Sequence, residues 1–190
     1  NDGQAAPDVR FVARSGGGSL VLLPGESVLA LRSGKVKQNV LRMRWLGARI
    51  DAEIRAEAPL AGRVNRLRGS DPTRWHLAIP TFARVRYANL YRGIDAVYYG
   101  SGDHLEHDLV VAPGADPAQA RLEFVGADSV TLDAAGDLVV ALADDTVRLH
   151  APFAYQERDA QRIAVASRWV LEGRRAQVEL GDYERQRPLV

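Results

Sequence analysis

The chain has 190 residues, 46% of them hydrophobic and 26% charged, and is therefore long enough for a globular domain with a substantial core. Its 25 Lys and Arg residues balance 24 Asp and Glu residues, so there is no broad basic surface of the kind that nucleic acid requires. The absence of cysteine excludes disulfides, thiolate catalysis and cysteine-ligated metals. No apolar run approaches the roughly 20 residues of a membrane-spanning helix, so we expect no membrane insertion.

Short β-strands are predicted from the N-terminus onward. "DVRFVAR" at 8–14 and "NVLRMRWLGA" at 39–48 alternate apolar and polar residues, as half-buried strands do. Between them, Leu20–Leu23 and Ser27–Arg32 are expected to form a hairpin around "PGE". The same two-residue rhythm predicts strands at 83–87, 96–99, 105–111, 120–125, 129–132, 138–143, 146–149, 164–171 and 177–180.

Helical signals are confined to two short turns. Asp71-Pro72 and Asp116-Pro117 each place a capping Asp before a Pro, which suits the first position of a helical turn. No amphipathic pattern extends over a dozen residues, and no internal repeat recurs at a fixed period. The sequence therefore predicts an all-β fold, an antiparallel two-layer β-sandwich with short helical turns only, as a single domain over residues 1–190.

The segment "DHLEHDLVV" at 103–111 is the first candidate site. In a strand, His104, Glu106 and Asp108 share one face at steps of about 7 Å, and together they offer nitrogen and oxygen ligands to a divalent metal. The alternative is the solvated face of a sheet strand whose opposite face is buried, which involves no chemistry. His107 lies on the apolar face and is expected to be a hydrogen-bonded core residue.

Carboxylates and aromatic rings supply two further hypotheses. Paired carboxylates for hydrolysis are drawn from Asp95, Asp103, Glu106 and Asp108. Rings for stacking on a sugar are drawn from Trp75, Tyr91, Tyr98 and Tyr99. Because Tyr98 and Tyr99 point to opposite faces of a strand, at least one of them can be exposed. Core packing is the alternative for all four rings.

Several motifs also carry a family resemblance. They are, in chain order, "NDGQ", "DVRFVARSGGGSLVL", "GRVNRLRGSDPTRW", "YRGID", "HDLVVAPGADP" and "PFAYQ". Over essentially its whole length the chain resembles the β-rich N-terminal domain of large secreted bacterial proteins that carry SBBP repeats, which are of β-propeller type. The resemblance implies an extracellular or cell-surface setting, a signal peptide already removed, and a position ahead of the repeats. It supplies no catalytic residues, and His104 and His107 depart from its pattern, which weakens the metal site as a family trait.

These observations favour a non-catalytic extracellular recognition or assembly module that needs no cofactor. Its expected partner is a glycan or a protein module, the latter including the following propeller-type repeats or a neighbouring subunit. An edge strand offered to a neighbour is one physical route to such assembly. The alternative is a hydrolase of extracellular polysaccharide, either carboxylate-based or dependent on a divalent metal ion. That alternative requires the candidate side chains to converge in a concave pocket. A third hypothesis is a domain that caps a following propeller and exposes an apolar patch for it.

Overall fold

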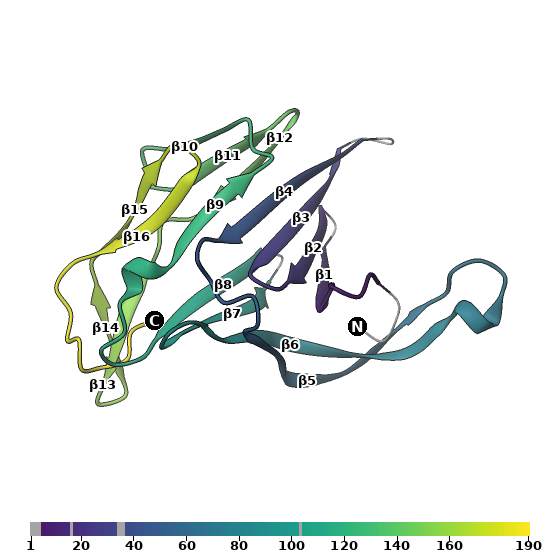
Figure 1. Cartoon of the computed structure of the whole chain (residues 1–190), viewed down its shortest axis with the longest axis horizontal. Coiled ribbons are helices and arrows are strands. Elements are labelled where there is room, and N and C mark those ends of the chain that lie inside the picture. Colours follow the sequence, from purple (N-terminus) through teal and green to yellow (C-terminus); the bar gives the residue numbers. More distant parts are fainter. Residues whose placement is uncertain (1–4, 16, 34–36, 103) are drawn as a thin grey trace.

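The fold is almost entirely β. The computed structural model describes residues 5–15, 17–33, 37–102 and 104–190, and its strands run through the whole chain (Figure 1). Within these ranges the only helical elements are two 3-10 turns, η1 (Pro72–Arg74) and η2 (Pro117–Gln119). The prediction of an all-β, sandwich-like fold with short helical turns is confirmed.

Both helical turns form where the Asp-Pro pairs predict them. The Asp71 carboxylate accepts a hydrogen bond from the Thr73 backbone N–H at 3.0 Å. The Asp116 carboxylate accepts one from the Ala118 N–H at 3.1 Å. In each case the side chain satisfies a free amide of the first turn, and the proline at its start has no amide to lose.

One layer of the sandwich is a seven-stranded antiparallel sheet that joins the two ends of the chain. In spatial order its strands are β1 (Phe11–Ser15), β2 (Gly18–Leu23), β3 (Glu26–Ser33), β4 (Lys37–Trp45), β9 (Arg121–Val125), β16 (Arg175–Leu180) and β15 (Ser167–Glu172). The β2–β3 turn is the predicted one, and Gly25 adopts the positive φ of +69° that it requires.

The second layer is a four-stranded antiparallel sheet made of consecutive strands. These are β5 (Glu53–Arg66), β6 (His76–Tyr91), β7 (Ile94–Ser101) and β8 (His104–Val111). Two small sheets complete the fold. They consist of β10 (Ser129–Leu132), β11 (Leu138–Leu142) and β12 (Asp145–Leu149), and of β13 (Ala154–Arg158) and β14 (Gln161–Val165).

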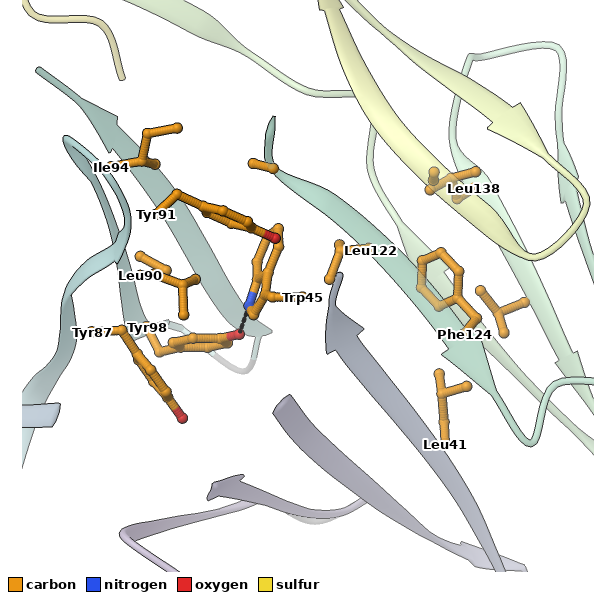
Figure 2. Close-up of a cluster of buried hydrophobic side chains, with 14 of the residues drawn as sticks. Leu41, Trp45, Tyr87, Leu90, Tyr91, Ile94, Tyr98, Leu122, Phe124 and Leu138 are labelled. Atoms are coloured by element: carbon orange, nitrogen blue, oxygen red, sulfur yellow. Dashed lines mark hydrogen bonds between the residues drawn. The ribbon is translucent and has the colours of Figure 1, made fainter. Parts of the chain in front are cut away.

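The core forms one cluster between these layers. Leu41 and Phe124 come from the seven-stranded sheet, Leu90 and Ile94 from the four-stranded sheet, and all four are completely buried (Figure 2). Leu138, on the small β10–β12 sheet, is equally buried and belongs to the same cluster. The alternating strand pattern thus turns one face of each sheet inward, as a sandwich requires.

Polar atoms inside this core are paired across the layers. The Trp45 indole N–H donates to the Tyr98 hydroxyl at 3.0 Å (Figure 2), which links β4 to β7. The Tyr87 hydroxyl donates to the Leu23 carbonyl oxygen at 3.0 Å. A buried polar group without a partner costs about 1–3 kcal/mol, so both bonds hold the two sheets in one relative position.

The β5–β6 hairpin extends far beyond the sandwich (Figure 1). β6 pairs with β7 only from Arg84 toward the body, where Arg84 lies opposite Tyr99. Past the Pro59–Phe82 pair the hairpin continues as a two-stranded ribbon. We call residues 59–82 the arm.

Apart from β13, which the sequence did not predict, the predicted strands differ from the observed ones in two main places. The run 164–171 is divided at Ala166 between β14 and β15, because the chain passes from the small β13–β14 sheet into the seven-stranded sheet. The second difference is β5 together with the outer part of β6. Its sequence "EIRAEAPLAGRVNR" contains Pro59 and Gly62, and neither side of the outer ribbon is buried, so no alternation marks it.

Candidate functional site

The outer face of the four-stranded sheet carries most of the predicted site residues. On β7, Ala96 and Tyr98 point into the core, so Asp95, Val97 and Tyr99 point away from it. On β8, Glu106 lies opposite Tyr99 and Asp108 lies opposite Val97 in the antiparallel register. The outer face therefore collects carboxylates around Tyr99, as the alternation of residues 103–111 predicts.

An ion network ties this face together. The Arg86 guanidinium on β6 donates to Glu57 on β5 at 2.6 Å and to Asp95 on β7 at 3.0 Å. The two carboxylates raise the pKa of Arg86, with the hydrogen bond to Glu57 as the largest cause. Asp95 also accepts the backbone N–H of Asn89 at 2.8 Å. Arg86 thus links three strands, and Asp95 is one of its two carboxylate partners.

Tyr99 and Asp108 form a second pair on the same face. The Tyr99 hydroxyl donates to the Asp108 carboxylate at 2.9 Å, and the Arg84 guanidinium lies 5.9 Å from the centre of the Tyr99 ring. Partial burial and the neighbouring carboxylates raise the pKa of Tyr99 above its ordinary value. The hydroxyl therefore stays protonated as a donor, and the ring is partly covered by Arg84.

The predicted metal ligands share a strand face but are not gathered into a ligand sphere. His104 and Glu106 are exposed, and Asp108 is half-buried beneath Tyr99. Across the ranges that the structure describes, no group of three or more His, Asp or Glu side chains is arranged to hold a metal ion. Asp103, a further candidate carboxylate, lies outside the described residues.

The four predicted sugar-binding rings fall in three different environments. Tyr91 and Tyr98 are only 4% and 6% exposed and belong to the core (Figure 2), so neither offers a ring face to a ligand at the surface. The Tyr91 hydroxyl donates to the Leu46 carbonyl at 2.9 Å, and burial raises its pKa to about 12. Tyr99 lies half-buried on the outer face, and Trp75 lies half-buried at the end of the arm.

His107 occupies the core side of β8, as expected. Its ring stacks on Tyr98 with 5.5 Å between centroids and meets Trp45 edge-on at the same separation. Burial lowers the pKa of His107, and the nearby Asp108 charge opposes that shift only in part. The ring is therefore held by aromatic contacts, where the sequence suggested hydrogen bonding.

A further carboxylate cluster at the β10–β11 turn is engaged internally. The Asp137 carboxylate accepts the backbone N–H of Ala151 at 2.8 Å and contacts His150 Nδ1 at 3.1 Å. Arg148 pairs with both Asp133 and Asp137. The pKa of Asp137 is lowered, chiefly by the Ala151 N–H. This cluster fastens the turn to the end of β12 and to the segment that follows it.

The arm is the largest feature that the sequence did not predict. None of its residues is buried, and four of its aliphatic side chains are strongly exposed: Leu60 at 53%, Val64 at 45%, Leu67 at 59% and Leu77 at 61%. The sequence "PLAGRVNRLRGSDPTRWHL" mixes leucines and arginines at irregular spacing, so neither a strand nor a helix with one buried face is indicated. Such a segment is interpreted as a loop, unless its first and second halves are recognised as two strands that pair with each other.

Side chains fix the shape of the arm where its strands are irregular. The register shifts between Pro59 and Arg66, and Ala58 and Ala78 have φ of 52° and 54°, unusual for residues other than glycine. The Asn65 side-chain oxygen accepts the Ala78 N–H at 2.8 Å. The Thr81 hydroxyl donates to the Gly62 carbonyl at 2.6 Å. These bonds replace ladder hydrogen bonds that the bulges interrupt.

The end of the arm is closed in a similar way. The Trp75 indole N–H donates to the Gly69 carbonyl at 3.1 Å, across the loop that η1 occupies. Asp71 accepts both the backbone N–H and the hydroxyl of Thr73. Leu67 lies next to this loop, and these hydrogen bonds therefore hold the backbone near its exposed side chain in a defined conformation.

Comparison with known proteins gives the family of the chain. A family model described as a domain of unknown function, DUF7948, matches residues 1–190. The chain belongs to this family. No match was found among curated proteins or among solved structures. Across the described residues of this DUF7948 member, no helix is long and apolar enough to cross a membrane.

Proposed function

We propose that the chain is a non-catalytic recognition and assembly module of a bacterial extracellular protein, and that it binds a protein partner through the arm. The observation that carries this proposal is the exposure of Leu60, Val64, Leu67 and Leu77 on a projecting ribbon that contains no buried residue. Exposed apolar groups gathered on one element mark an interaction site.

The low stability expected of a two-stranded ribbon supports the proposal that a partner covers it. An isolated two-stranded hairpin is marginally stable in water, and three strands or packing against another element are needed for independent stability. The outer ribbon has neither within the described chain, because β7 pairs with β6 only from Arg84 inward. Its leucines would gain about 25 cal/mol for each Å² of apolar area that a partner covers.

The bonds that shape the arm support the same conclusion. Asn65, Thr81 and Trp75 each hold the ribbon in a defined form through a side-chain hydrogen bond to the backbone. A surface ordered in advance loses less conformational entropy when it binds. The extracellular setting rests on the resemblance of several motifs of the chain to the N-terminal domains of secreted SBBP repeat proteins.

The hydrolase hypothesis gains no comparable support. Asp95 is engaged by Arg86, and Asp108 by Tyr99, so neither carboxylate is positioned as a free nucleophile or base. Two of the surface hollows of the described chain, of about 240 and 280 Å³, lie beside Ser167 and beside Pro24. The candidate carboxylates line neither.

Site-specific photo-crosslinking in the bacterium that makes the full-length protein tests the proposal. A photoreactive residue replaces Leu67 or Leu77 on the arm, and the matched control replaces Thr146, an exposed residue of β12. We expect discrete protein adducts from both arm positions and none from the control. Arm positions that yield no more adduct than Thr146 would overturn the proposal.

A further inference from the structure

We infer that the partner is a second copy of this chain, with the arm of each copy lying along the β8 edge of the other. This inference rests on the proposed function and names the partner of the same surface. A reciprocal arrangement of this kind is closed by a two-fold axis and makes the same contact twice.

The distribution of charge favours contact between an arm and a body. The arm contains Arg63, Arg66, Arg68, Arg74 and one acidic residue, Asp71, which gives it a net charge of +3. The rest of the chain then has 21 basic and 23 acidic residues, a net charge of −2. Two arms side by side repel each other, whereas an arm against a body is attracted.

Three of the four arginines of the arm are available for such a contact. Arg63 donates to the Ala78 carbonyl, and no ion pair with a carboxylate involves Arg63, Arg68 or Arg74 within the described part of the chain. By contrast, Arg42, Arg86 and Arg148 on the body each have carboxylate partners. Arg63, Arg68 and Arg74 therefore keep their positive charge free of any carboxylate partner among the described residues.

The β8 edge has the complementary features. β8 is the outermost strand of its sheet, and its outward pairing within the described chain is limited to Val111, which bridges to Leu189. Residues 105–110 therefore offer backbone groups to an added strand. Leu105 is 44% exposed, and the carboxylates of Glu106 and Asp108 stand beside it on the outer face.

The arm can supply that added strand. β5 is the other outermost strand of the same sheet, so its outer edge is also open. Pairing of β8 with β8 across a two-fold axis is the simpler alternative, but it would bring together the Glu106 and Asp108 carboxylates of both copies. The arm brings arginines and leucines to the same edge. Its 24 residues fall within the roughly 20–30 residues that each partner contributes to an interface of standard size.

Sedimentation velocity of the purified chain, over a concentration series from low micromolar to submillimolar, tests this inference. We expect a reversible dimer that weakens as salt is added, because screening reduces the attraction between arm and body. Arg68→Glu with Arg74→Glu reverses the charge of the arm, and Glu106→Arg with Asp108→Arg reverses that of the edge. Each pair of substitutions is expected to weaken the dimer by at least about tenfold.

A chain that carries both reversals restores the attraction and is expected to recover the dimer. The control is Leu132→Glu, at an exposed leucine of β10, and it is expected to leave the dimer unchanged. Because Asp108 accepts the Tyr99 hydroxyl, thermal unfolding checks that the edge variant is folded. If it is not, Glu106→Arg alone takes its place in both the single and the combined variant.

Three outcomes would overturn the inference: a monomer at every concentration, a dimer that survives the arm reversal, or a combined variant that stays monomeric. A dimer strengthened by salt would also overturn it, since that is expected of contact between two arms. Crosslinks from Leu67 to a different protein, in a chain that sediments as a monomer, would reject the second copy and leave the proposed function standing. Absence of any arm crosslink would reject both.

Discussion

At the scale of single residues, the contact between the two sheets depends on an aromatic group that contains the imidazole of His107. His107 lies between Tyr98 and Trp45, and Trp45 donates its indole proton to the Tyr98 hydroxyl. Burial favours the neutral imidazole, because a charged ring would lose its hydration there. Protonation of His107 is therefore expected to make the stability of the sandwich depend on pH.

We predict that stability falls as the pH is lowered below the ordinary histidine pKa of 6.5. The pKa of His107 is lowered in the folded state, so the unfolded chain binds a proton that the folded chain does not. The free energy of unfolding is then fully retained above pH 6.5 and decreases by up to about 1.4 kcal/mol per pH unit below it, until the lowered pKa is reached.

Denaturant unfolding at a series of pH values measures this effect. His107→Phe keeps an aromatic ring in the site and is expected to flatten the decrease between pH 6.5 and the start of carboxylate titration. The control is His104→Phe, at an exposed position of the same strand, which is expected to keep the decrease. Identical pH profiles for the wild type and His107→Phe would show that this ring is not the cause.

The sequence placed some of these residues correctly and others not. Alternation along 103–111 was sufficient to put Glu106 and Asp108 on one face and His107 on the other. Alternation could not predict that Tyr91 and Tyr98 are buried, because the burial of a strand face depends on which other sheet packs against it. The partners of Asp95 and Asp108 come from β6 and β7, and no local pattern identifies them.

At the scale of elements, the arm separates cleanly from the sandwich. Pro59 and Phe82 are directly paired across the hairpin, and the Phe82 ring meets Phe11 of β1 edge-on. Every residue beyond this pair is at least partly exposed. The ribbon therefore contributes little to the core and can be removed at a point where the two strands already face each other.

We predict that replacement of residues 60–81 by Asn-Gly leaves the sandwich folded. A two-residue turn of this type suits a directly paired position in a hairpin, and Phe82 keeps its contact with Phe11. The free energy of unfolding is expected to change by no more than about 1 kcal/mol, because no buried side chain is lost. Denaturant unfolding measures the change, and a loss of several kcal/mol would show that the arm is part of the core.

The strands of the body could be predicted because one face of each is buried. β7 reads as apolar alternation since Ala96 and Tyr98 enter the core, and the β2–β3 turn is marked by Pro24 and Gly25. The arm could not be predicted in the same way. Its strands are exposed on both sides, and its register shifts, between Pro59 and Arg63 and between Val64 and Arg66, lie beside bonds made by Asn65 and Thr81.

At the scale of the whole molecule, the chain combines a closed sandwich with an open ribbon. The sandwich contains the buried cluster, whose members extend along the chain from Leu20 to Leu189. The ribbon carries three of the exposed leucines, Leu60, Leu67 and Leu77, and four of the arginines. The molecule therefore combines a compact support with a projecting element, and the proposal that this element binds a partner rests on that division.

Amide hydrogen exchange tests most directly the central claim that the arm is only marginally stable until a partner covers it. In dilute chain, where no partner is bound, we predict that amides of residues 59–82 exchange orders of magnitude faster than those of Ile94–Ser101, because the ribbon opens without disturbing the core. As the chain is concentrated and the arm becomes covered, exchange from the arm should slow while that of β7 stays constant. An arm as strongly protected as β7 in the dilute chain would contradict the account, because such a ribbon would need no partner.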